Sequence, residues 1–175
     1  MIEHYTEAIV LDRNPRGEVD AAITLYTKEL GKVTALSKSI RKITSKLSGH
    51  LMPGNKVRLR IVEQNTVQAI DALSEKQECD IRELLPFLRF LNGVLPEGEA
   101  DLNFWHLVNG VIEKCHFRAE TYRYILEVLG FGPNEALCGS CGAKEIAHFH
   151  MPDIMFLCSR CRVKARIPND EIIDL

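Results

Sequence analysis

Short apolar stretches separated by turn residues fill the first 72 positions of the chain. Five of them predict β-strands, at residues 6–12, 20–27, 33–40, 56–63 and 66–73. The alternation is clearest in the fourth, where Val57, Leu59 and Ile61 point to one face and Arg58 and Arg60 to the other. Five short strands joined by turns predict a small closed or partly closed barrel.

The periodicity changes to a helical one after residue 74. Asp80 is placed to cap one helix and Asp101 a second, and a third, over residues 120–129, ends at Gly130. Pro86 falls inside the first of these patterns and predicts a kink or a later start. The fold class predicted is therefore α+β.

Composition places the chain among ordinary globular proteins. It has 175 residues, of which 46% are hydrophobic and 26% charged, and its net charge is −2. No apolar run approaches the roughly 18 residues of a membrane span, and the first residues lack the basic and apolar regions of a secretory signal. We therefore expect a cytoplasmic protein without membrane contact, in which the six cysteines indicate a metal site before disulfides.

Four of these cysteines form two Cys-x-x-Cys pairs, Cys138 with Cys141 and Cys158 with Cys161. Two thiolates from each of two tight turns match the four tetrahedral ligands that structural zinc prefers. Because all four positions are filled by cysteine, none is left for water or substrate. We predict one structural Zn²⁺ per chain, in a zinc ribbon whose two halves are joined by a hairpin.

The other interpretation of the four cysteines is a pair of redox-active motifs, but the βαβ context of thioredoxin-like motifs is absent. His148 and His150 are more simply surface or packing residues than ligands. Cys79 and Cys115 stand alone and are expected to be small buried apolar residues.

Positive charge gathers between residues 28 and 60, which contain nine Lys and Arg but a single acidic residue, Glu29. Such an excess attracts polyanions through a local positive field. The predicted DNA-binding residues are Lys32, Lys38, Arg41, Lys42, Lys46, Arg58 and Arg60. Tyr26 is the only nearby candidate for base stacking, so contact with the phosphate backbone is favoured. The alternative is a solvated charged face without a ligand.

Catalysis is not predicted. The His-x-Glu that precedes Pro-Cys-x-x-Cys in zinc deaminases is missing, and so are the Gly-rich phosphate loop and the His-Glu-x-x-His motif. A protein-binding adaptor whose zinc ribbon carries the interaction, with no direct role on DNA, remains the alternative function.

The order of these parts resembles the RecO family of bacterial DNA repair and recombination mediators. The similar segments are residues 8–11 (Ala-Ile-Val-Leu), 25–32 (Leu-Tyr-Thr-Lys-Glu-Leu-Gly-Lys), 37–42 (Ser-Lys-Ser-Ile-Arg-Lys), 45–51 (Ser-Lys-Leu-Ser-Gly-His-Leu) and 125–133, which leads into the first cysteine pair. The resemblance implies an N-terminal OB-fold at residues 1–74, a helical domain at 75–132, and a zinc-ribbon module at 133–175 packed on the helical domain.

In function, the resemblance implies binding of single- and double-stranded DNA and annealing of complementary strands in the nucleoid. It also implies partnership with RecR, contact with single-strand-binding protein, and indirect help in loading RecA. The helical region is short for the family, so no residue for the single-strand-binding-protein contact is assigned.

Overall fold

The computed structural model describes residues 1–75 and 78–175, which form two compact units. Unit 1 is Met1–Cys115 and unit 2 is His116–Leu175. The boundary between them falls inside the predicted helical domain, whose first two helices belong to unit 1 and whose third belongs to unit 2. The division into three domains, at residues 1–74, 75–132 and 133–175, stays a prediction. Within the described ranges, no helix is long and apolar enough to cross a bilayer.

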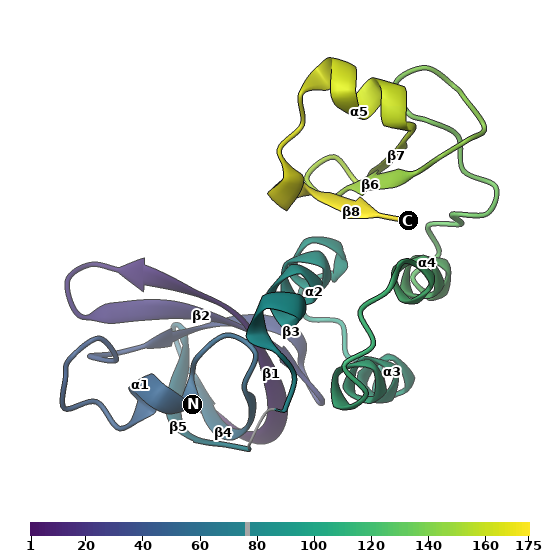
Figure 1. Cartoon of the computed structure of the whole chain (residues 1–175). Helices are drawn as coiled ribbons and strands as arrows, with labels where there is room; N and C mark the ends of the chain where they lie inside the picture. Colours follow the sequence, from purple (N-terminus) through teal and green to yellow (C-terminus); the bar gives the residue numbers. More distant parts are fainter. Residues whose placement is uncertain (76–77) are drawn as a thin grey trace. The chain divides into compact units, whose positions relative to one another are not determined.

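Unit 1 begins with the five predicted strands and a short helix, followed by two longer helices (Figure 1). The elements are β1 (Ile2–Arg16), β2 (Asp20–Thr27), β3 (Gly31–Ser37), α1 (Leu47–His50), β4 (Lys56–Glu63), β5 (Val67–Ser74), α2 (Ile81–Val94) and α3 (Leu102–Glu113). The strands follow the order β1-β2-β3-β5-β4, and β4 pairs back onto β1, so the sheet closes into a barrel. The pairs are antiparallel except β3 with β5, which is parallel.

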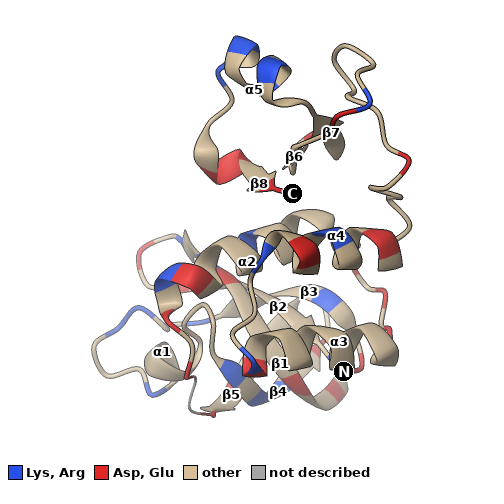
Figure 2. Ribbon diagram, turned by 45° about the vertical axis from the view of Figure 1, so that its right-hand side comes forward, with Lys and Arg blue, Asp and Glu red and all other residues tan. Residues whose placement is uncertain are grey.

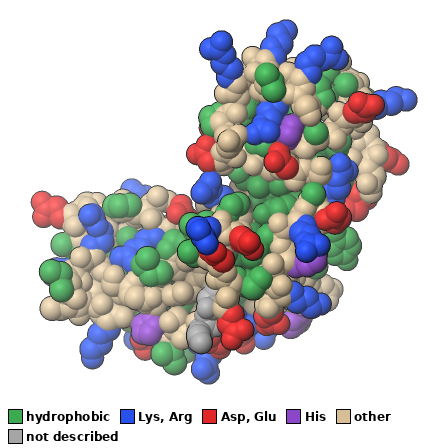
Figure 3. All heavy atoms as spheres, in the orientation of Figure 1, with side chains coloured by type: hydrophobic (Ala, Val, Ile, Leu, Met, Phe, Trp, Pro, Cys, Tyr) green, Lys and Arg blue, Asp and Glu red, His purple; other side chains and the backbone are tan. Residues whose placement is uncertain are grey.

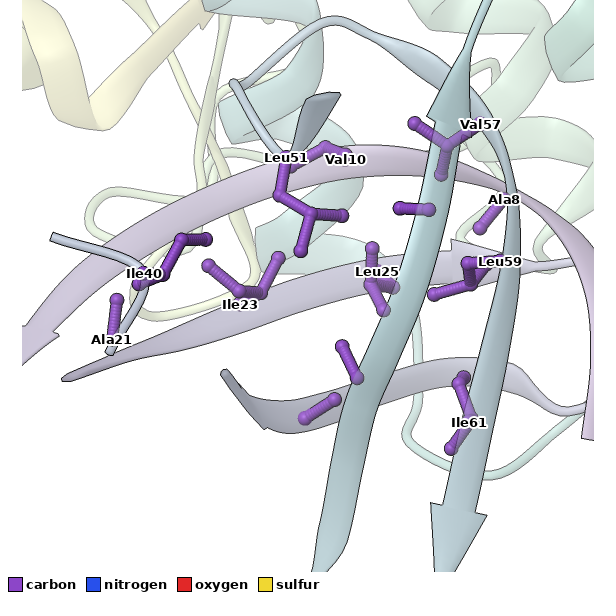
Figure 4. Packing of buried hydrophobic residues seen from close by; sticks show 13 residues of the cluster. Ala8, Val10, Ala21, Ile23, Leu25, Ile40, Leu51, Val57, Leu59 and Ile61 are labelled. Atoms are coloured by element: carbon purple, nitrogen blue, oxygen red, sulfur yellow. The ribbon is translucent and has the colours of Figure 1, made fainter. Parts of the chain in front are cut away.

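The barrel interior is built from the alternating apolar positions of its strands. Val57, Leu59 and Ile61 of β4 are buried in it, as the alternation predicts, and Leu25 of β2 lies among them (Figure 4). Thirteen buried residues form this cluster, so each strand contributes its inward face to one continuous core.

The two helices of unit 1 cover the outside of the barrel. Asp80 and Asp101 accept backbone N–H groups at the starts of α2 and α3, which confirms both predicted caps. The α2 helix continues through Pro86. Tyr26, on the outer side of β2, packs against Phe104 and Trp105 of α3, with ring centroids 6.1 and 5.5 Å apart.

A disulfide joins Cys79, before α2, to Cys115, after α3, across 36 positions of sequence. The expectation of two unpaired buried cysteines is therefore wrong. Sequence spacing gave no hint of the pairing, because it depends on the end of α3 lying close to the start of α2, where the two Cα atoms are 5.5 Å apart.

Unit 2 combines one helix with a small sheet and a second short helix. Its elements are α4 (Ala119–Val128), β6 (His148–His150), β7 (Met155–Leu157), α5 (Ser159–Ala165), the 3-10 turn η1 (Asn169–Glu171) and β8 (Ile172–Asp174). Gly130 follows α4 with φ +83°, which only a residue without Cβ adopts readily. The sheet order is β7-β6-β8, so the predicted hairpin is β6–β7 and the end of the chain is an edge strand. Phe149 of β6 packs against Phe131 and Phe156.

Candidate metal centre and basic surface

Two loops of unit 2 bring the four predicted zinc ligands together. Cys138 and Cys141 lie before β6, while Cys158 is the N-cap residue of α5 and Cys161 lies one turn into it. Their four Sγ atoms lie within 4.8 Å of one another. The sequence prediction that these residues gather is confirmed, and the arrangement is one that could hold a metal ion.

The backbone holds each pair in a tight turn. The Cys138 N–H donates to the Ala143 carbonyl, and the Gly142 N–H returns to the Cys138 carbonyl, both at 2.8 Å. Gly142 has φ +72°, so a glycine suits this turn. The first turn is tied to β7 because the Gly139 N–H donates to the Phe156 carbonyl at 2.9 Å.

The spacing of the sulfurs fits a tetrahedral ion. Zinc–sulfur bonds of about 2.3 Å place the corners of a tetrahedron about 3.8 Å apart, and the Sγ atoms of Cys141 and Cys158 are 3.7 Å apart. All four thiols are free, and three of the four cysteines are buried. A closed four-sulfur set leaves no coordination position for a substrate, which is the arrangement of structural sites.

The electrostatics of the cluster favour the thiolate of Cys138 and oppose that of Cys141. Burial by itself would raise the pKa of Cys138, but backbone N–H groups of Cys158, Ser140 and Cys141 oppose it and lower that pKa to about 6. At Cys141 the backbone N–H of Ala143 lowers the pKa, but the three neighbouring sulfurs outweigh it and raise the pKa to about 11. Negative charge on four adjacent sulfurs therefore requires a cation.

The two histidines of β6 bind carboxylates and not the cysteine cluster. His148 Nδ1 lies 2.7 Å from Asp174 of β8. His150 Nε2 lies 3.3 Å from Glu171, and its Nδ1 lies 3.1 Å from Asp153. Both rings are buried, so the packing interpretation of these histidines agrees with the structure.

On unit 1, the cations predicted to bind DNA divide into two groups. Lys38, Arg41, Lys42 and Lys46 are exposed on the segment between β3 and α1, residues 38–46, which we call the basic loop (Figure 2). Between described residues, no ion pair involves any of these four side chains. The loop is held against the β1–β2 turn because Ser39 N–H donates to Asp20 at 2.6 Å.

The remaining three predicted cations have partners among the described residues, and so does Arg41 of the basic loop, whose guanidinium donates to the Gly17 carbonyl at 3.0 Å. Lys32 Nζ donates to the carbonyl of Asn92 at 2.8 Å, and burial lowers its pKa against the opposing effect of Glu97. Arg58 lies 3.8 Å from Glu75, and Arg60 lies 3.5 Å from Glu3. Whether these residues contact DNA stays a prediction, but each already has a partner.

The aromatic candidate for stacking is not accessible. Tyr26 is 1% exposed, and burial together with the nearby Asp101 raises the pKa of its hydroxyl. The strand pattern alone could not show this burial, because Tyr26 is covered by Phe104 and Trp105 of α3, which come nearly eighty positions later in the chain. A cation that sequence reasoning missed is Arg13 of β1, which reaches the carbonyl of Ser48 in α1 at 2.9 Å.

A closed five-stranded barrel with an exposed basic loop, followed by helices and a four-cysteine cluster, defines a modular α+β protein. Residues 1–76 match the family model described as "Recombination protein O N terminal". The chain is similar to the DNA repair protein RecO of Thermodesulfovibrio yellowstonii, with 28% identity covering 90% of this chain and 70% of the relative. It is 29% identical to the DNA repair protein RecO of a Nocardioides species, over 90% of this chain and 73% of that protein.

The chain is therefore similar to RecO proteins over most of its length, and the resemblance found in its sequence is confirmed. The match spans most of this chain but leaves more than a quarter of each of these two relatives unmatched.

Proposed function

We propose that this chain is a non-catalytic DNA repair and recombination mediator that binds DNA through the basic loop. Similarity to RecO proteins supports the role in repair and recombination. The observation that carries DNA binding is the loop itself, where Lys38, Arg41, Lys42 and Lys46 are all exposed without a carboxylate partner among the described residues. Released counterions make such a cluster favourable for phosphates.

The barrel topology supports an OB-fold as the scaffold of this surface. The order β1-β2-β3-β5-β4, with β3 and β5 parallel, is that of a five-stranded barrel of this kind. We infer that the loop contacts the backbones of single- and double-stranded DNA, and that neutralising two strands allows complementary ones to anneal. RecR and single-strand-binding protein are the proposed protein partners, RecA is affected indirectly, and the setting is cytoplasmic.

We infer that the four cysteines hold one structural Zn²⁺. Cys138, Cys141, Cys158 and Cys161 would be its ligands, and the ion would supply folding free energy to unit 2 without taking part in a reaction. A structural metal site of this geometry would serve a protein-binding adaptor equally well. The basic loop is therefore the feature that favours a DNA-binding mediator over an adaptor.

A salt titration of DNA binding tests the proposal. Lys38, Arg41 and Lys42 are changed together to Gln, and the affinity for a single-stranded oligonucleotide is followed by fluorescence anisotropy at several salt concentrations. Each lost phosphate contact should reduce the slope of log affinity against log salt by about 0.7, or roughly 2 for three contacts. An unchanged affinity and slope would refute DNA binding by the loop.

The matched control removes three exposed cations elsewhere in the chain. Arg89, Lys114 and Arg118 are exposed and lie outside the barrel. Their combined change to Gln alters the net charge equally and should leave most of the affinity. An equal loss in both variants would mean that net charge, and not the basic loop, controls binding.

A further inference from the structure

A cavity of about 460 Å³ opens at one end of the barrel, between the β1–β2 hairpin and the segment that contains α1. We call it the hairpin groove. Its walls include Arg13, Pro15, Ala21, Arg41, Met52 and Pro53. It lies beside the basic loop, and Figure 3 shows that Lys and Arg side chains are interspersed with hydrophobic ones over this part of unit 1.

A β-bulge creates the hairpin wall of the groove. The pairing of β1 with β2 shifts between Val10 and Asp12, so Arg13 lies opposite Ile23 and Pro15 opposite Ala21. Residues directly opposite one another share a face of the sheet, and both Ile23 and Ala21 belong to the barrel core. The bulge therefore turns the Arg13 and Pro15 side chains toward the inner side of the hairpin.

The opposite wall is held by two fully buried side chains, Ile40, which lies near Ala21, and Leu51, which lies near Val10 (Figure 4). Arg41 follows directly and is held twice: its N–H donates to the Val19 carbonyl at 2.9 Å, and its guanidinium donates to the Gly17 carbonyl at 3.0 Å. The groove is thus bounded by backbone that hydrogen bonds fix on both sides.

The lining combines guanidinium groups with apolar side chains, which suits a ligand that has both anionic and apolar parts. Arg13 donates to the carbonyl and hydroxyl of Ser48 at 2.9 and 3.3 Å and to the thioether of Met52 at 3.3 Å, and a guanidinium carries five N–H donors, more than these contacts use. Between the two arginines the surface is made of proline, alanine and the half-exposed thioether of Met52. The groove residues include no carboxylate, so a cationic ligand is disfavoured.

We propose that the hairpin groove takes one unstacked base of a single DNA strand, with Arg13 and Arg41 holding phosphates on its two sides. The inference rests on the proposed DNA binding by the basic loop. It adds a preference for single-stranded over double-stranded DNA, which contact with the phosphate backbone alone does not provide. Bases in a duplex are stacked and paired, so only a single strand offers a base to the groove without the cost of extrusion.

The test compares two oligonucleotides of equal length and charge, one of thymidines and one with an abasic backbone. Contact with phosphates alone predicts equal affinities. A base seated against the apolar groove walls predicts that the thymidine strand binds more tightly than the abasic one, because the abasic strand has no base to bury there. Affinities are measured by anisotropy at fixed salt.

Two single substitutions locate the effect. Met52→Ala removes an apolar wall at a side chain that is 48% exposed, so folding is preserved, and should reduce the preference for thymidine. Ile43→Ala is the matched control, because Ile43 is fully exposed on the basic loop and does not line the groove. It should keep the preference.

The outcomes separate this inference from the proposed function. Equal binding of both strands by the unaltered protein, with a steep salt dependence, would overturn the base site and leave DNA binding by the loop intact. A preference that survives Met52→Ala as fully as Ile43→Ala would overturn the assignment to the groove. No salt-dependent binding of either strand would overturn both.

Discussion

Removing one cysteine of the metal cluster should unfold unit 2 and leave unit 1 folded. Cys138→Ser is the perturbation, because Cys138 is 2% exposed and its backbone is hydrogen-bonded to Gly142 and Ala143 of the same turn. Serine keeps the shape of the side chain but provides a poor ligand for a soft metal site. Ser140→Ala is the matched control: Ser140 is exposed in the same turn, and its backbone N–H toward the Cys138 sulfur is retained.

The size of unit 2 sets the expected magnitude. At about 0.05–0.15 kcal/mol per residue, residues 116–175 would have a free energy of unfolding of roughly 3–9 kcal/mol. Structural zinc contributes about 10–16 kcal/mol in small domains, or roughly 2.5–4 kcal/mol per thiolate if shared equally among four. Three of the five buried residues in the local core are themselves ligands, namely Cys138, Cys158 and Cys161. Loss of one ligand therefore removes much of the stability, and chelation should remove all of it.

The position of the single tryptophan allows the two units to be followed separately. Trp105 lies in α3 of unit 1, so its fluorescence reports on unit 1 alone, whereas limited proteolysis after residue 116 reports on unit 2. We expect Cys138→Ser or a zinc chelator to abolish metal content and protease resistance of unit 2, with the Trp105 thermal transition unchanged. A metal-free unit 2 that resists protease and melts cooperatively would refute the reasoning.

Two further predictions concern the cysteines. Reducing the Cys79–Cys115 disulfide, or changing Cys79 to Ser, should lower the free energy of unfolding of unit 1 by up to about 4 kcal/mol, because the cross-link closes 36 positions of chain; an unchanged urea midpoint of Trp fluorescence would contradict this. Metal affinity should rise with pH, since Cys141, whose pKa is raised to about 11, must lose its proton on binding. The pKa of Cys138 is lowered to about 6, so below pH 6 its thiolate also becomes protonated and must lose that proton on binding. The slope of log metal affinity against pH should therefore increase by about one below pH 6. Competition titrations with a chelating dye measure this slope, and a constant value would contradict the prediction.

Local sequence signals predicted most of the elements in unit 1. Strict alternation in β4 identified its inward face, and the carboxylates of Asp80 and Asp101 marked the starts of two helices. These signals succeed because they depend on neighbours within a few positions of the chain. The four-cysteine cluster was predictable for the same reason, since each turn of two ligands is local and tetrahedral coordination requires the second turn to meet the first.

The contacts of the predicted DNA-binding residues could not be predicted from local sequence. Charge counting treats Lys38 and Arg58 alike, yet Lys38 is exposed on the loop while Arg58 lies beside Glu75, seventeen positions later in the chain. Tyr26 is an aromatic residue of the kind that stacks on bases, but it is covered by α3, nearly eighty positions later in the chain. Partners so distant in sequence leave no trace in the local pattern.

By itself the sequence determined the strands, the helix starts, the cysteine cluster and the resemblance to RecO, because each rests on spacing within a short stretch or on the order of such stretches. Tertiary structure alone decided which cations have no carboxylate partner among the described residues, that Cys79 pairs with Cys115, and that a bulge in β1 directs the Arg13 side chain toward the hairpin groove. These features arise from closure of the barrel and the return of the helices, which join residues that chain connectivity keeps apart.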